Sequence, residues 1–132
     1  ECYEGSIWET AMFASHNRLN NLVAIVDRNY LCATDFTEDI VALGPMDEKW
    51  RSFGWRVINI NGHSFEEILS ALSGFRSRKF AKPLMIIADT TKGKELSFMS
   101  DVPLWHALAP KGQQAIEAKD ELNKKDEEKE NE

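Results

Sequence analysis

Apolar and polar positions follow a helical period at the start of the chain. Apolar residues recur at helical spacing between Ile7 and Met12, which predicts a first helix that fades near His16 to Arg18. Ser6 and Glu9 have the spacing of a capping box, in which each side chain satisfies a free backbone amide of the first turn. The pattern therefore predicts a helix with Ser6 as its N-cap.

Three short runs of mostly apolar residues predict β-strands. They span Asn21–Asp27, Trp55–Ile60 and Pro83–Asp89. Continuous apolar runs of this length are typical of strands buried on both faces, as in parallel sheets. Because helical patterns separate the strands, we predict an α/β fold with a parallel sheet and helices on both faces, with neither an internal repeat nor a second domain.

A second helix is predicted between the first two strands. Pro45 is favourable at the first position of a helix, and Gly54 is placed to end it. Trp50 and Phe53 would face inward.

A third helix is predicted between the last two strands. Ser64 and Glu67 repeat the capping-box spacing, and Gly74 is placed to end the helix. Its predicted apolar stripe, at positions i, i+3, i+4 and i+7, consists of Phe65, Ile68, Leu69 and Leu72.

Two segments, 28–44 and 90–112, show no regular period, and long connections of this kind are often functional. After them, residues 113–132 form a charged tail that differs in composition from residues 1–112. From residue 115 onward there are eight acids and four lysines, so this stretch carries −4 of the chain's net charge of −6. A final helix is predicted to start near Gln113, and we expect the tail to be a solvated helix or disordered.

Composition excludes several classes of protein. The acidic balance argues against nucleic-acid binding, and no apolar run reaches the roughly 20 residues that a membrane span needs. Because no basic-then-apolar secretory signal opens the chain either, we expect a cytoplasmic protein. Two distant cysteines indicate neither a disulfide framework nor a zinc site. The chain starts at Glu1 and its first helix starts at once, which suggests a truncated beginning.

Ligands of parallel sheets bind beyond the carboxyl ends of the strands. After the first strand, the amide oxygen of Asn29 and a nearby backbone carbonyl are hard ligands suited to Mg²⁺ or Ca²⁺, although Asn is also a common turn former. His106 lies in the long loop after the last strand, where it could face a ligand. Lys92–Lys94 in the same loop could hold an anion, although the segment is not a P-loop.

Glu4 and Glu9 flank the start of the first helix, where the helix dipole favours carboxylates. For Glu9, the ordinary alternative is a capping role. His16 is expected to be a surface charge at the end of a helix, and His63 to shape a turn.

Taken together and in order, these segments resemble the N-terminal, thiamine diphosphate-binding domain of transketolases. The resemblance runs from Glu1 to about Pro110. It implies a Rossmann-like fold, of which this chain holds the C-terminal part. The matching segments are Glu4–Glu9, Asn21–Asn29, Lys49–Trp55, Asn61–His63, Lys92–Lys94 and Trp105–His106.

The resemblance implies a set of site residues. The family motif opens with Gly-Asp-Gly, which would lie immediately before Glu1, and closes at an Asn. By position, Asn29 would bind Mg²⁺ through its side chain and Leu31 through its backbone carbonyl. His106 would reach the diphosphate of the cofactor and the substrate. Two departures, at Ala33 and Ala107, suggest a divergent branch of the family.

The family's glutamates at the positions of Glu4 and Glu9 lie at a dimer interface and connect paired active sites. The resemblance further implies a transferase of two-carbon ketol units between sugar phosphates in the pentose phosphate pathway, working as a homodimer or heterotetramer. A separate C-terminal domain or chain would supply the pyrimidine-binding part, so this chain alone is expected to be inactive. The alternatives are a keto-acid dehydrogenase component and a non-catalytic remnant.

Overall fold

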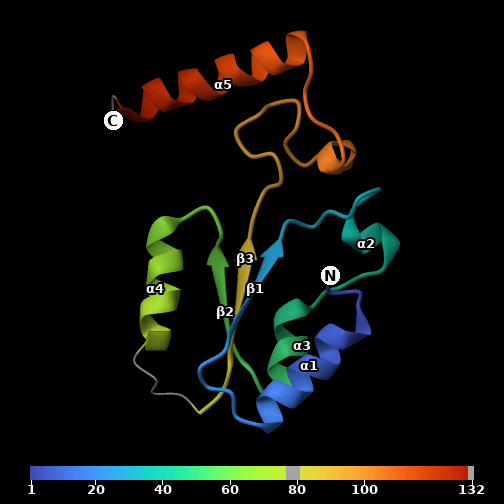
Figure 1. Ribbon diagram of the computed structural model, residues 1–132, viewed down its shortest axis with the longest axis vertical. Helices are drawn as coiled ribbons and strands as arrows, with labels where there is room; N and C mark the ends of the chain where they lie inside the picture. Colours follow the sequence, from blue (N-terminus) through green and yellow to red (C-terminus); the bar gives the residue numbers. More distant parts are fainter. Residues whose placement is uncertain (77–80, 131–132) are drawn as a thin grey trace. The chain divides into compact units, whose positions relative to one another are not determined.

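The computed structural model describes residues 1–76 and 81–130 (Figure 1). The chain separates into two compact units. Residues 1–28 and 41–90 form the first, which we name the sheet unit, and residues 29–40 and 91–132 form the second, which we name the loop unit.

The sheet unit is built on three parallel strands. They are β1 (Val23–Arg28), β2 (Arg56–Asn61) and β3 (Leu84–Asp89), arranged in the order β1-β3-β2. The chain passes from β1 over the position of β3 to β2 and then returns to β3, as right-handed crossovers on opposite faces allow. The predicted fold class, a parallel α/β sheet with helices on both faces, is confirmed.

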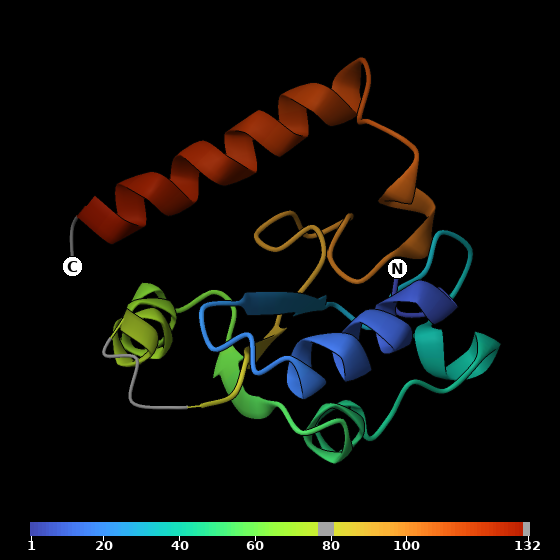
Figure 2. The same ribbon diagram turned by 60° about the horizontal axis from the view of Figure 1, so that its bottom comes forward.

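Helices cover the two faces of the sheet unequally (Figure 2). Helices α1 (Gly5–His16) and α3 (Met46–Ser52) pack on one face with the β3 residues Met85 and Ile87. Helix α4 (Phe65–Arg76) packs on the other face, where Ile86 belongs to the core. Alternate residues of β3 thus enter different cores, as the two-residue period of a strand requires.

Burial on both faces holds for the central strand but not for the edge strands. The first five residues of β3 are all buried, whereas Ile25 on β1 is 60% exposed although it is the register partner of Ile86. The apolar run of β1 therefore gave a wrong prediction for this residue, because α4 packs against β2 at the opposite edge of the sheet.

Three tryptophans connect α1, α3 and the residue that precedes β2. The ring centroid of Trp50 lies 5.3 Å from that of Trp8 and 5.0 Å from that of Trp55. The indole N–H of Trp55 donates to the carbonyl oxygen of Ala11 at 2.9 Å in the buried core. Aromatic pairs at these separations add to the stabilisation from burial alone.

The predicted end of α3 at Gly54 is confirmed. Gly54 has a φ of +88°, and its N–H donates to the carbonyl of Arg51 at 2.9 Å. The N–H of Trp55 donates to the carbonyl of Trp50 at 3.3 Å, which completes a Schellman motif. Trp50 is buried and Phe53 packs against the same core, as predicted.

The predicted capping box at Ser6 is wrong. The helix begins at Gly5, and Glu4 is its N-cap without a side-chain capping bond. The backbone already turns before Ser6, because the N–H of Glu4 donates to the carbonyl of Glu1 at 2.8 Å. Ser6 therefore lies inside the first turn, where its side chain is past the capping position.

The second capping box is half confirmed. The N–H of Glu67 donates to the Ser64 hydroxyl at 3.2 Å, but the Glu67 carboxylate accepts from the N–H of Asn61 at 2.7 Å instead of returning to Ser64.

The predicted stripe of α4 is rotated. Phe65 and Leu69 are 82% and 65% exposed, while Ile68 and Leu72 pack on the sheet. The apolar stripe that packs on the sheet has the same spacing and starts three residues later. The sequence pattern alone did not show which of these two stripes faces the sheet. The stripe that packs consists of Ile68, Ala71, Leu72 and Phe75. Gly74 does not end the helix, which continues to Arg76.

The loop unit holds short turns and one long helix. Within the segments predicted to be irregular lie α2 (Thr37–Ile40) and the 3₁₀ turn η1 (Pro103–His106). Helix α5 (Gln113–Glu130) begins at the predicted residue, so the charged tail is helical as far as it is described, and residues 131–132 lie outside the described residues. Across residues 1–76 and 81–130, no helix combines the length and apolarity that a bilayer span requires.

Hydrogen bonds connect α5 to the preceding loop. The Glu121 carboxylate accepts hydrogen bonds from the Ser97 N–H at 2.7 Å and the Ser97 hydroxyl at 2.6 Å. The ammonium of Lys125 donates to the carbonyl of Glu95 at 2.7 Å, and Ala118 is buried. The bonds from Ser97 lower the pKa of the Glu121 carboxyl below its usual value.

A pair of glycine substitutions tests the end of α3. Gly54→Ala should destabilise the fold by about 1–3 kcal/mol, because alanine is strained at a positive φ. A Cβ there would also meet the Ser15 hydroxyl at 2.4 Å. Gly74→Ala is the matched control, because a Cβ in that helix meets nothing within 4 Å and should be neutral or stabilising by up to about 1 kcal/mol. Urea denaturation followed by circular dichroism measures both, and equal midpoints would contradict the expectation.

Acid should weaken the attachment of α5. A carboxyl whose pKa is lowered on folding contributes stability above its unfolded pKa, and the contribution is lost as the pH falls through the lowered value. The protection factor of the Ser97 amide, which compares its exchange rate with the intrinsic rate at the same pH, should therefore fall at acid pH in the wild type. In Glu121→Gln protection should be weaker at neutral pH and should lack this acid-dependent loss. The exposed Glu117→Gln on the same helix is the control, and an identical pH response in all three proteins would refute the role of Glu121.

Candidate functional site

The residues predicted to bind a cofactor all belong to the loop unit. Asn29 and Leu31 follow β1, whereas His106 lies more than seventy positions further along the chain. Residues 29–40 and 91–132 nevertheless form one compact unit, which continues from the carboxyl ends of β1 and β3. Carboxyl ends of parallel strands are the usual place for a ligand. In Figures 1 and 2 the chain after β1 lies near η1.

Asn29 begins a tight turn. Its side-chain oxygen accepts a hydrogen bond from the N–H of Leu31 at 3.0 Å. Tyr30, between them, has a left-handed backbone with a φ of +61°. An amide oxygen has two lone pairs, so this Asx-type turn leaves acceptor capacity on Asn29.

The backbone carbonyl of Leu31 takes no part in the hydrogen bonds of the short antiparallel bridge that contains it. Leu31 and Phe36 form an antiparallel bridge, but the two hydrogen bonds of the bridge run from Cys32 to Asp35 and from Thr37 to Tyr30. These are the bonds that flank a non-hydrogen-bonded pair. The Leu31 carbonyl takes part in neither bond.

The two oxygens fit a hard cation. Mg²⁺ prefers oxygen donors, takes only one or two from the protein in many phosphate sites, and uses water and phosphate for the rest. The amide oxygen of Asn29 and the carbonyl of Leu31 are donors of this kind, two residues apart on one turn. Among the described residues, no cluster of three His, Cys, Asp or Glu side chains could hold a metal by itself.

The loop after β3 is folded tightly upon itself. Gly93 has a φ of +70°, and a Cβ there would lie 2.7 Å from the carbonyl oxygen of Met99. The indole N–H of Trp105 donates to the carbonyl of Phe98 at 3.0 Å, and the two rings meet edge to face at 5.5 Å between centroids. These contacts hold η1, and with it His106, against the Lys92 end of the loop.

Lys92 and His106 lie together in this loop. The Lys92 ammonium is 3.4 Å from Nδ1 of His106. Lysine can only donate, so Nδ1 accepts and the proton of a neutral imidazole stands on Nε2. The pair then presents an ammonium and an N–H donor, which suits an anionic ligand. Sequence reasoning noticed the segment Lys92–Lys94 but did not include Lys92 among the site residues, and the Lys-Gly-Lys pattern was the available signal.

Glu4 and Glu9 belong to the sheet unit and are both exposed. Glu4 is the N-cap of α1, and Glu9 lies five positions later on the same helix. Their predicted role at a dimer interface stays a prediction.

The turn after β2 lies at the same edge of the sheet. The N–H of Gly62 donates to the carbonyl of Asp89 at 2.8 Å, and the N–H of His63 donates to the side chain of Asn61 at 2.9 Å. A Cβ at Gly62 would come within 2.4 Å of the Thr90 methyl, so this turn needs glycine. His63 therefore forms part of the turn, as predicted.

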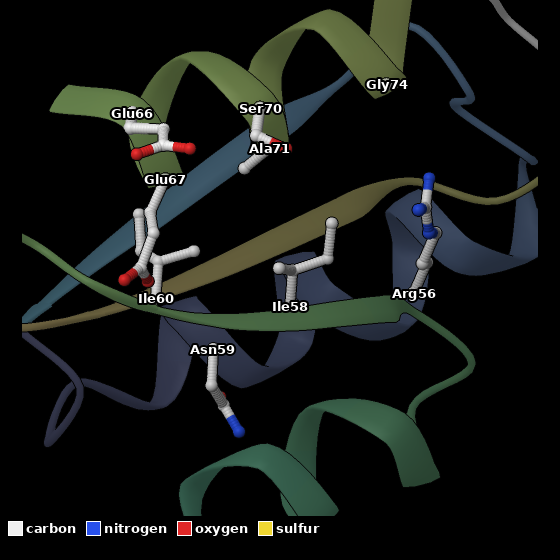
Figure 3. Close-up of a pocket in the computed structure, with 9 residues that line it drawn as sticks. All are labelled: Arg56, Ile58, Asn59, Ile60, Glu66, Glu67, Ser70, Ala71 and Gly74. Atoms are coloured by element: carbon white, nitrogen blue, oxygen red, sulfur yellow. The ribbon is translucent and has the colours of Figure 1, made fainter. Parts of the chain in front are cut away.

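A groove of about 370 Å³ lies elsewhere in the sheet unit, between β2 and α4 (Figure 3). Ile58 and Ile60 point from β2 toward α4, while Asn59 points away. None of the predicted site residues lines this groove. The carboxylate of Glu67 at its rim is already bonded to a backbone N–H of β2.

Comparison with known proteins places these observations in a family. Residues 1–127 match the family described as transketolase, thiamine diphosphate binding domain. The chain is 42% identical over 132 residues to one of the subunits of apulose-4-phosphate transketolase from Phocaeicola vulgatus, covering 97% of this chain and 46% of that protein. It is 37% identical over 106 residues to human transketolase, covering 80% of this chain and 16% of that protein. The chain thus spans less than half the length of either relative.

Solved structures agree with these matches. Transketolase from Campylobacter jejuni superposes with a TM-score of 0.78 at 30% identity, over 90% of this chain and 18% of that one. A transketolase from Pichia stipitis superposes with a TM-score of 0.80 at 21% identity, over 90% of this chain and 18% of that one, which supports the fold alone. From its sequence matches and its fold together, the chain belongs to the transketolase family, as part of the thiamine diphosphate-binding domain.

Proposed function

We propose that the protein carrying this chain transfers a two-carbon ketol unit between sugar phosphates or related aldehydes, using thiamine diphosphate and Mg²⁺. The observation that supports it most is the composition of the loop unit. It combines two oxygen donors at Asn29 and Leu31 with the cationic pair of Lys92 and His106. A magnesium diphosphate needs both kinds of group.

Asn29 and Leu31 would hold the metal ion. Their oxygens are neutral, so they can bind Mg²⁺ without adding negative charge beside a diphosphate. The hydrogen bond within the turn orients the Asn29 amide before any ion arrives. This preorganisation reduces the ordering that binding would otherwise require.

Lys92 and His106 would face negative charge. The Lys92 ammonium balances phosphate charge, and the Nε2 proton of His106 is available to a phosphate or substrate oxygen. When bound, thiamine diphosphate supplies the carbanion stabilisation of the reaction. Lys92 and His106 would orient the bound ligand, and His106 would hold a proton on Nε2.

The names of the relatives support the reaction class. Besides the apulose-4-phosphate transketolase, they include a 6-deoxy-6-sulfo-D-fructose transketolase subunit from Clostridium sp., 46% identical over 98 residues, which cover 74% of this chain and 35% of that protein. We infer a sugar-derived phosphate or related sugar as substrate, a partner chain or domain that carries the pyrimidine-binding part, and assembly as a homodimer or heterotetramer. Glu4 and Glu9 are proposed to lie at the interface between paired sites, and the 132-residue chain alone is proposed to be inactive.

Replacing Asn29 tests the metal site. Asn29→Ala in the complete protein should abolish Mg²⁺-dependent binding of thiamine diphosphate, because it removes an oxygen ligand and the acceptor of the Leu31 N–H. Asn29→Asp keeps a side-chain oxygen that can bind the ion and accept from the Leu31 N–H, so it should retain part of the affinity. Isothermal titration calorimetry measures both variants, and the exposed Asn20→Ala is the control. Wild-type affinity in Asn29→Ala would sink the assignment.

Replacing His106 tests the reaction. His106→Ala should lower kcat with xylulose 5-phosphate and ribose 5-phosphate about a hundredfold, within the range typical of a lost proton-transfer group. The melting temperature should change little, because His106 is exposed. The exposed His16→Ala is the matched control. Unchanged kcat and KM would remove His106 from the site, and turnover of pyruvate in place of the sugar phosphates would favour the keto-acid dehydrogenase alternative.

A further inference from the structure

One side chain at the carboxyl edge of the sheet contacts the ends of both neighbouring strands. Thr90 follows β3, and its N–H donates to the carbonyl of Arg28 at 3.3 Å. The Thr90 hydroxyl donates a hydrogen bond to the Asp27 carboxylate. Its methyl group lies against Gly62 so closely that a Cβ there would be 2.4 Å away. Thr90 therefore joins the end of β1, the turn after β2 and its own strand.

The chain leaves the sheet unit immediately after these contacts. The loop unit begins at residue 29 after β1 and resumes at residue 91 after β3. Asn29 comes two residues after Asp27, and Lys92 comes two residues after Thr90. A shift of either strand end would be passed along two peptide units to a residue of the candidate site.

We propose that Asp27 and Thr90 are positioning residues for thiamine diphosphate and Mg²⁺. Their hydrogen bond fixes, relative to each other, the two points from which the Asn29 turn and the Lys92 loop begin. The inference rests on the proposed function. Asp27 and Thr90 would affect the affinity for the cofactor indirectly, by positioning Asn29 and Lys92. Partners outside the ligand shell commonly control affinity in this way.

Burial distinguishes this role from a general contribution to folding. Asp27 is exposed and Thr90 is half-buried, whereas the neighbouring β3 residues up to Ala88 are buried. A hydrogen bond at an exposed edge adds little to the stability of a sheet whose core lies elsewhere. Its loss should therefore appear in ligand binding more strongly than in unfolding.

Two substitutions of Thr90 separate its hydroxyl from its methyl group. Thr90→Val keeps the shape that packs on Gly62 and removes the hydroxyl, whereas Thr90→Ser keeps the hydroxyl and removes the methyl. In the complete protein with its pyrimidine-binding part, Thr90→Val should raise the Kd of thiamine diphosphate with Mg²⁺ about tenfold or more, as loss of an outer-shell partner typically does. Thr90→Ser should stay close to the wild type.

A double variant shows whether the two residues act together. Asp27→Ala should weaken binding like Thr90→Val, and Asp27→Ala with Thr90→Val should be no worse than either alone, because both remove the same bond. Asp27→Asn, which keeps an acceptor oxygen, should recover most of the affinity. Melting temperatures without cofactor are measured in parallel and should fall by similar small amounts in Thr90→Val and Thr90→Ser.

The outcomes separate the two proposals. If the wild type binds the cofactor and Thr90→Val binds it equally well, the positioning role is overturned. It is also overturned if Val and Ser weaken binding equally in step with the melting temperature, because a structural role would do that. If the wild type does not bind thiamine diphosphate at all, the proposed function has failed, and this inference falls with it.

Discussion

The burial of β3 on both faces is the constraint on which the rest of the sheet unit depends. β3 lies between the other two strands, and parallel neighbours are joined by connections that cross the faces of the sheet. Here α3 lies in the connection that passes over β3, and α4 lies in the connection that returns on the opposite face. Two separate cores result, and β3 contributes alternate residues to each.

This arrangement brings polar residues together at one edge of the sheet. Parallel strands in register end at the same level, so Arg28, Asn61 and Asp89 are aligned. The connections that follow them need not pack a core, and they are therefore free to carry Asn29, Lys92 and glycine turns. Along the chain, the candidate functional residues thus follow directly after the strands that form the core, which is the usual arrangement in α/β proteins.

Sequence patterns predicted the sheet well because its signals are local. Apolar runs located all three strands to within one or two residues, and Gly54 and Gln113 marked helix ends correctly. One error came where the sequence allows two helix faces of the same spacing. The stripe of α4 has a second version with identical spacing, and whether Phe65 or Phe75 faces the sheet depends on where β2 lies. That position is a tertiary fact which a helical period does not contain.

The site was predictable only in part, for a related reason. The positions of Asn29 and His106 after strands made them candidates, but their specific roles came from the resemblance to a family, since an Asn after a strand is ordinarily a turn former. Asn29 does form such a turn, so the structural and functional interpretations are compatible in the same residue. The proximity of Lys92 to His106, and the bond from Thr90 to Asp27, join residues far apart in the chain. No periodicity reports contacts of that range.

The way the loop unit is held has a consequence for ligand binding. Its helix α5 is fastened by bonds from Ser97 and Lys125 that lie at exposed or half-buried positions, and Ala118 is its only described residue in the buried class. Such contacts contribute modestly to stability compared with burial of a strand. A ligand that binds only the ordered loop would stabilise that loop. The stabilisation would increase with the logarithm of the free ligand concentration. Cofactor binding and loop order are then linked, and both loops start from the hydrogen-bonded ends of β1 and β3.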